Sequence, residues 1–283
     1  MSPLVPQPEN RPAAARTVPV IGVRTAGLIA ALPSLPERLA WARENGFGGV
    51  EIAATGRPRD LYAPAVSREE RARLKGEVAG FAAVAVEAPH QETYDVSLVS
   101  PSASIRRASV TEIWSCLRLV EALGGGVVIV RTGNAPAGVD ADRQRAFLVE
   151  CLTTLDRMAG DHNARVAVTL CDYFQRGGAR DDRAGLLLGE IPLVHTGIAL
   201  DAQFLADETS DDLTALIRRA GPKLAHLHAA PVFAAPVPAA ALREIGYANM
   251  ACLAPDLDAA FPLEAARSAK TVWEGLFARA IAG

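Results

Sequence analysis

Eight short apolar runs recur along the chain, and each is followed by a polar loop and then by a longer stretch with helical periodicity. In the longer stretches apolar residues return at positions i, i+3, i+4 and i+7, which predicts amphipathic helices. Continuous apolar runs that alternate with helices are typical of parallel strands buried on both faces. The predicted strands cover residues 18–24, 48–54, 82–88, 125–131, 165–170, 196–202, 223–229 and 249–254.

Eight strand–helix units fit one closed (β/α)8 barrel. The structural rival is a doubly wound open sheet, but no glycine fingerprint of the GxGxxG type follows the first strand. We therefore predict an α/β fold, a single (β/α)8 TIM barrel over residues 17–283. Residues 1–16 are rich in proline and polar side chains and lack the apolar core of a signal peptide, so we expect a disordered tail.

Composition narrows the class of protein. The chain has 283 residues, half of them apolar, and a net charge of -3, which gives no electrostatic footprint for nucleic acid. No apolar run is long enough to span a membrane. The four cysteines are far apart and form no CxxC pair, which favours a reducing cytoplasm. We expect a cytoplasmic protein with a small-molecule substrate. In one interpretation of the charged residues this substrate is anionic. The sequence leaves open whether the protein forms a homo-oligomer.

Two histidines, His226 and His228, stand one residue apart in the seventh apolar run. Residues two apart on a strand point to the same face, so both side chains are expected to project together. This arrangement suits a metal ion or a substrate. The plainer alternative is that one or both are buried structural histidines.

Barrel enzymes place their chemistry at the carboxyl ends of the strands. The residues expected there are acids, bases and cations without a nucleophile motif such as GxSxG, which favours proton transfer. His162 and His195 precede strands and are excluded, because they belong to the opposite end. The predicted catalytic set is Glu87, Asp201 and His228, and the predicted substrate contacts are Arg24, Glu51, His90, Arg131, Asp172, Tyr173 and Gln203.

Several of these residues have a second interpretation. The planar donors of Arg131 suit a carboxylate, a phosphate or a developing oxyanion, but an internal ion pair with Glu87 or Asp201 would also use them. Glu51 could serve only to close the barrel mouth, and His90 could be an exposed loop residue. His90 is also the alternative to His228 as a proton-transfer partner.

Two loops bear on the substrate. Residues 171–183, which include Tyr173 and Phe174, are expected to form a mobile cover over the site. Residues 230–241 are apolar and proline-rich, which favours a less polar substrate than a sugar.

Four segments together resemble the xylose isomerase-like barrels, the sugar phosphate isomerase/epimerase superfamily. The resemblance lies in the order and spacing of the segments and extends over nearly the whole chain after the tail. It implies the barrel fold and isomerase or epimerase chemistry, although one barrel hosts many reactions. The segments are IGVRTAGLIAALPSLPERLAWARENGFGGVEI, EAPHQETYDVSLVSPSASIRRASV, IALDAQF and LAHLHAA.

The resemblance also implies one divalent metal, held by Glu, Asp, His and Glu at the ends of strands 5 to 8. Asp201 and His228 match two of these ligands. The glutamate positions fall on Thr169, or on Cys171 if the register shifts by two, and on Ala254. We therefore predict no metal cofactor, with a zinc site of Asp201, His228 and Cys171 as the alternative.

Other positions at which the family carries histidine or aspartate are altered as well, which excludes the three-zinc arrangement of the endonuclease IV branch. Glu264 cannot replace a lost ligand, because it belongs to the predicted last helix. The altered positions hold Glu87, Arg131, Phe204 and Pro231.

The sequence thus predicts a small-molecule isomerase or epimerase that works by metal-independent acid/base catalysis, or a related lyase or cyclase acting on an intermediate of specialised metabolism. The alternative is a catalytically inactive barrel that binds a ligand or a partner subunit. The many ionisable residues at the mouth favour an enzyme, because a scaffold has little reason to keep costly buried charges.

Overall fold

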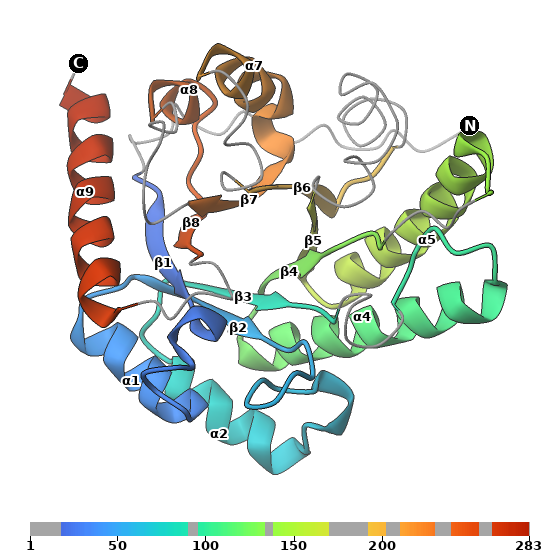
Figure 1. The fold of residues 1–283 in the computed structure, drawn as a ribbon, viewed down its shortest axis with the longest axis horizontal. Helices are drawn as coiled ribbons and strands as arrows, with labels where there is room; N and C mark the ends of the chain where they lie inside the picture. Colours follow the sequence, from blue (N-terminus) through green and yellow to red (C-terminus); the bar gives the residue numbers. More distant parts are fainter. Residues whose placement is uncertain are drawn as a thin grey trace, which may run out of the picture.

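Eight parallel strands close into a barrel in this computed structural model, and β8 pairs with β1 to complete the ring (Figure 1). The structure describes residues 18–89, 96–133, 138–169, 192–201, 210–229, 239–254 and 262–282. The strands are β1 (Val20–Arg24), β2 (Gly49–Ala53), β3 (Ala83–Glu87), β4 (Gly126–Val130), β5 (Ala164–Thr169), β6 (Thr196–Asp201), β7 (Leu224–Ala229) and β8 (Met250–Leu253). The predicted single (β/α)8 barrel is confirmed, whereas the predicted tail, residues 1–16, lies outside the described residues.

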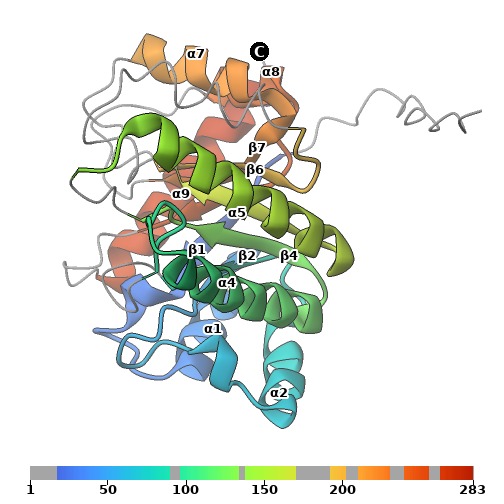
Figure 2. The same ribbon diagram turned by 90° about the vertical axis from the view of Figure 1, so that its right-hand side faces the viewer.

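Helices surround the ring of strands (Figure 1), and α4 and α5 cover the side that faces the viewer in Figure 2. Within the described part of the chain, no helix combines the length and the apolar character needed to cross a membrane. The helices are α1 (Leu35–Glu44), α2 (Arg68–Val78), α4 (Ala103–Leu123), α5 (Ala141–Asp161), α7 (Ser210–Ala220), α8 (Ala239–Glu244) and α9 (Leu263–Ala282).

Local sequence explains where helix α1 begins and where helix α4 ends. The Ser34 hydroxyl accepts a hydrogen bond from the backbone N–H of Glu37, and the Glu37 carboxylate accepts one from the backbone N–H of Ser34, which forms a capping box at the start of α1. Helix α4 ends at Gly124, whose φ of 110° lies in the left-handed region that favours glycine.

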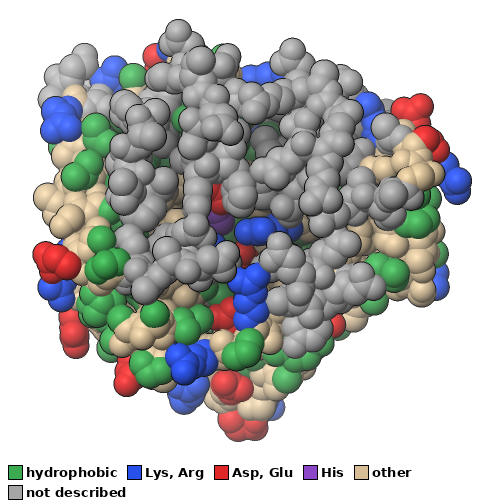
Figure 3. All heavy atoms as spheres, in the orientation of Figure 1, with side chains coloured by type: hydrophobic (Ala, Val, Ile, Leu, Met, Phe, Trp, Pro, Cys, Tyr) green, Lys and Arg blue, Asp and Glu red, His purple; other side chains and the backbone are tan. Residues whose placement is uncertain are grey.

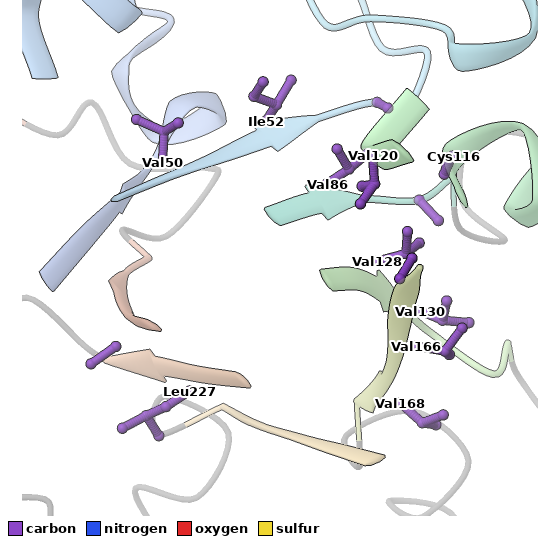
Figure 4. Packing of buried hydrophobic residues seen from close by; sticks show 14 of the residues in the cluster. Val50, Ile52, Val86, Cys116, Val120, Val128, Val130, Val166, Val168 and Leu227 are labelled. Carbon is purple, nitrogen blue, oxygen red and sulfur yellow. The ribbon is translucent and has the colours of Figure 1, made fainter. Parts of the chain in front are cut away.

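The outward faces of the strands form the core between barrel and helices. Val50, Ile52, Val86 and Val128 are fully buried, and Figure 4 shows such side chains pointing away from the barrel axis. Cys116 and Val120 of α4 pack in the same cluster. Burial of β-branched side chains on this face explains the continuous apolar runs in the sequence.

The inward faces carry unusually small side chains. The interior cluster consists mainly of alanines, with Ile129, Met250 and Cys252 as larger members. Gly22 and Gly49 leave room for the Met250 thioether, because a Cβ at either position would lie 2.2 or 2.5 Å from its sulfur. Barrels of this fold are usually filled by Val, Ile and Leu, so the interior here has space for polar groups.

Two glycines give a matched test of this geometry. Gly126 has a φ of +147°, and a Cβ there would lie 2.2 Å from the carbonyl oxygen of Val84, so Gly126→Ala should lower the free energy of unfolding by about 2 kcal/mol or more. Gly76 lies in α2 with open space around it. Gly76→Ala should therefore raise the free energy of unfolding by about 0.5–1 kcal/mol. Urea denaturation of both variants measures this, and equal effects would contradict the barrel packing.

Candidate active site

Charged side chains from five strands meet at the carboxyl end of the barrel. Figure 3 shows basic, acidic and histidine side chains together at the centre of this face, in the orientation of Figure 1. Arg24 ends β1, Glu87 ends β3 and Asp201 ends β6. Glu51 lies in the middle of β2, and the two histidines lie on β7.

An irregular step between β6 and β7 brings the histidines inside. Ile198 pairs with Leu224, but the next residue of β6, Ala199, pairs with His226, so β7 carries one extra residue at this point. Side chains alternate between the two faces of a strand, so without this bulge both histidines would point to the outer face. With it, His228 stands beside Asp201 on the inner face.

Glu51 is the centre of the cluster. Its carboxylate is fully buried, and its Oε2 accepts hydrogen bonds from Nε2 of His226 at 2.9 Å and from Nε2 of His228 at 2.8 Å. Its Oε1 lies 3.2 Å from Nε of Arg24. Burial alone would raise the pKa of Glu51, but the positive charge of His228 and the two hydrogen bonds hold that pKa well below its usual value.

His228 lies between two carboxylates. Its Nδ1 is 3.1 Å from Oδ2 of Asp201, while its Nε2 meets Glu51. Because an ionised carboxylate only accepts hydrogen bonds, both ring nitrogens carry protons and the ring is an imidazolium. Burial acts to lower the pKa of His228, but the charge of Glu51 and the hydrogen bond to Asp201 raise it to about 10.

His226 has a different protonation state. Burial lowers its pKa below the usual value, so the ring is neutral and its single proton is on Nε2, which donates to Glu51. Its Nδ1 is buried and makes no hydrogen bond to any residue that the structure describes. The two imidazole rings meet edge to face, with centroids 4.9 Å apart and an interplanar angle of 86°.

Arg24 and Glu87 form a second ion pair, in which both groups are almost fully buried. Nε of Arg24 donates to Oε2 of Glu87 at 3.1 Å, and NH2 donates to Oε1. Burial acts to raise the pKa of Glu87, but the charge of Arg24, its hydrogen bonds and the charge of Arg131 together outweigh burial, and the net shift of the pKa is downward. Burial likewise lowers the pKa of Arg24, but the charges of Glu87 and Glu51 raise it above its usual value.

Among the residues that the structure describes, the charges of this cluster balance. Three carboxylates, Glu51, Glu87 and Asp201, face three cations. Two of these cations are Arg24 and the His228 imidazolium. The third is the half-buried Arg131, whose charge also lowers the pKa of Glu87. Buried charges are tolerated only when they are paired in this way.

The structure brings most of the described candidate residues together. Arg24, Glu51, Glu87, Asp201 and His228 form one network, in which Arg24 contacts Glu87 through two nitrogens. Their roles in catalysis or substrate binding stay predictions. The predicted contacts His90, Asp172, Tyr173 and Gln203, together with Cys171, lie outside the described residues.

Residues excluded on sequence grounds do lie elsewhere. His162 caps the end of α5 and contacts Trp114 and Glu121 of α4. Glu264 lies in α9 with a side chain that is 76% exposed. The hydrogen bonds between Glu51 and both histidines were not predicted from the sequence. The only local signal for them was a glutamate at an inward position of β2.

Glu51, His226 and His228 come close enough to hold a cation, with one ligand atom of each within 4.8 Å of the others. One carboxylate and two imidazoles are the donors of many His2Glu zinc sites. Of the positions at which the resemblance implies glutamate ligands, Thr169 ends β5 and Ala254 follows β8, whereas Cys171, the other position considered for strand 5, lies outside the described residues. In the observed arrangement, moreover, both ring nitrogens of His228 are engaged by carboxylates.

Removing Arg24 tests the ionic network. Arg24→Met removes the cation that contacts both Glu51 and Glu87, so the free energy of unfolding should fall by about 3–5 kcal/mol. Arg73→Met is the control, because Arg73 pairs with Glu77 on the surface and its side chain is 48% exposed. That variant should unfold almost like the parent. Equal stability of the two variants in urea denaturation would show that Arg24 does not neutralise the cluster.

Comparisons with known proteins agree with this architecture. The chain superposes on a D-tagatose 3-epimerase-like protein with a TM-score of 0.75 and 16% identity, covering 92% of this chain and 97% of that one. It superposes on 3-keto-D-glucoside 4-epimerase from E. coli with a TM-score of 0.73 and 18% identity, covering 91% and 99%. For a D-psicose 3-epimerase the TM-score is 0.72 and the identity 18%, covering 90% and 98%.

At these identities the likeness concerns the fold, and no curated protein matches the chain in sequence. The family model described as xylose isomerase-like TIM barrel matches residues 39–263, well over half of the chain. This confirms the resemblance seen in the sequence, and the chain belongs to the xylose isomerase-like TIM barrel family.

Proposed function

We propose that this protein is an isomerase or epimerase that moves a proton on a small carbonyl substrate at the carboxyl end of the barrel. The observation that carries the proposal is the chain Asp201–His228–Glu51, in which an imidazolium lies 3.1 and 2.8 Å from two carboxylates. A carboxylate held by such a hydrogen bond is fixed in orientation, which general acid/base catalysis requires.

Asp201 is the proposed base. It is 9% exposed, more than Glu51 or Glu87, so it is the carboxylate of the network nearest to a substrate in the mouth. It would take the proton from the carbon next to the carbonyl group, and Arg131 would neutralise the negative charge that develops on oxygen. His228 acts through Asp201 and is a positioning residue in this scheme.

The return of the proton decides between two reactions. If the hydroxyl proton of the enediolate passes to the oxygen that carries the negative charge, and Asp201 returns its proton to the neighbouring carbon, the carbonyl group moves and the reaction is an isomerisation. If a second group protonates the original carbon from the other face, the reaction is an epimerisation. Glu87 on β3 is the proposed second group. It is ionised in the present network, so it would first have to take up a proton and release the hydrogen bonds from Arg24 before it could protonate that carbon.

A ketose or a related carbonyl compound is the proposed substrate class. The similar structures include proteins named for epimerisation of tagatose, psicose and a 3-ketoglucoside. The cationic groups of the mouth favour a substrate with an anionic or strongly polar group. A lyase or cyclase acting on a less polar intermediate remains the alternative reaction, but residues 230–238, which suggested it, lie outside the described residues.

Hydrogen exchange provides a test that does not require the natural substrate. Ketoses such as D-tagatose, D-psicose and D-fructose, incubated with the protein in D2O, should incorporate deuterium next to the carbonyl group, as measured by NMR. Asp201→Asn and His228→Ala should each slow incorporation by about 10²-fold. The control Glu264→Gln changes an exposed carboxylate of α9 and should leave the rate unchanged.

Two outcomes would overturn this assignment. Unchanged exchange in both site variants would remove Asp201 and His228 from the mechanism. No exchange with any carbonyl compound, in a protein that melts cooperatively, would favour the alternative of an inactive barrel that binds a ligand or a partner subunit.

We also propose that the site works without a metal. The support is the charge balance of the six ionisable groups, together with Thr169 and Ala254 at two ligand positions of the family. Protein purified without chelator should contain less than about 0.1 equivalent of any divalent metal, and EDTA should change neither its melting temperature nor the exchange rate.

One equivalent of metal, with activity lost on chelation, would contradict this second proposal. Variants then locate the site. Metal lost in both Glu51→Gln and His226→Gln would place it at Glu51, His226 and His228. Metal lost in Asp201→Asn but retained in His226→Gln would place it at the ends of β6 and β7 instead.

A further inference from the structure

A cavity of about 410 Å³ enters the barrel from the end opposite the candidate active site. It is lined by the beginnings of β1, β3, β4 and β8, and we refer to it as the floor cavity. Ala83, Ala85, Gly126 and Met250 form part of its wall, and His226 of β7 is one of its polar lining residues. Its volume lies in the range of small-molecule sites.

Small inward-facing residues create this space. Ala83 and Ala85 stand at inward positions of β3, where barrels of this fold usually carry Val, Ile or Leu. Met250 is the largest side chain of the interior cluster that also lines the cavity, and its thioether lies against Gly22 and Gly49. Methionine is unbranched and flexible, so it can move aside at low cost.

His226 contributes a polar ring to the wall of the floor cavity. Its Nε2 proton is committed to Glu51 at 2.9 Å, which leaves Nδ1 as a lone-pair acceptor. This nitrogen has no hydrogen-bond partner in the described part of the chain, and the residue is fully buried. A buried acceptor without a partner is destabilising, and a donor that reached it would remove that penalty.

The lining restricts the chemistry of such a donor. Among the described residues that form the floor cavity, His226 is the only ionisable side chain, and the polar groups beside it are the neutral amides of Asn163 and Asn249. Neither a cation nor an anion would find a counter-charge there. We propose that the floor cavity binds a small uncharged molecule that donates an O–H or N–H hydrogen bond to Nδ1 of His226, with Met250 moving aside.

This site is separate from the proposed reaction. It lies at the other end of the barrel, and its occupancy does not require that Asp201 act as a base. The two ends are nevertheless joined, because His226 and His228 share Oε2 of Glu51. A ligand on His226 is therefore two hydrogen bonds away from His228.

Nitrogen-15 NMR of the full chain labelled at histidine tests the proposal. The probe is 1,2-propanediol, which donates hydrogen bonds, and the comparison is 1,2-dimethoxyethane, which only accepts them. The His226 signals are assigned from their loss in His226→Gln, whose amide can still donate to Glu51. Without probe, Nδ1 of His226 should have the shift of an unprotonated nitrogen, and the diol alone should move it, saturably and at millimolar concentration.

Filling the cavity provides the matched variant. Ala83→Leu should weaken the response to the diol at least ten-fold, and Ala83→Val takes its place if the leucine variant does not fold. A soaked crystal should show a diol hydroxyl within hydrogen-bond distance of Nδ1. The proposal is overturned if Nδ1 proves to be protonated, if diol and ether act alike, if the filled variant responds like the parent, or if only water meets Nδ1 at saturating diol.

Discussion

A fully buried carboxylate that stays charged is the constraint on which the rest of this barrel depends. Glu51 is 0% exposed, and alone at that depth it would be protonated or would destabilise the fold. It stays ionised because Arg24 of β1 and two imidazoles of β7 surround it. These contacts require β1, β2 and β7 to keep a fixed register. The ionic network therefore forms only in the closed barrel, and the closed barrel is stable only with that network in place.

The barrel itself could be read from the sequence to within one or two residues. The apolar run 82–88 became β3 (Ala83–Glu87), and the run 223–229 became β7 (Leu224–Ala229). This worked because strands buried under helices need apolar side chains on their outward face, and because most inward positions away from the charged cluster carry alanine, glycine or another apolar residue. Both faces therefore appear in the sequence as one apolar run.

The site could be predicted only in part, because its contacts cross the barrel. The strand-end positions of Glu87, Asp201 and His228 followed from counting strands. The bond between Glu51 and His228 did not, because β2 and β7 are not neighbours in the sheet and no local pattern relates them. Nor did the extra residue on β7, although this bulge decides that the histidines point inward. In a run as short as LAHLHA, the sequence does not show where the alternation of side chains between the two faces of the strand is interrupted.

The protonation of His228 connects the electrostatics of the site with its metal chemistry. An imidazolium that donates to both Asp201 and Glu51 has no lone pair to offer, so a cation could bind there only after that proton had left. Metal binding and the present hydrogen-bond network are thus alternative states of the same residues. In the network state the positive charge resides on side chains fixed to β1, β4 and β7. Such groups cannot be exchanged or chelated, and the hydrogen bonds that they donate are restricted to the directions of their N–H bonds. A substrate oxygen would then have to be oriented by the geometry of the barrel mouth, since no free ion could adjust its position to meet it.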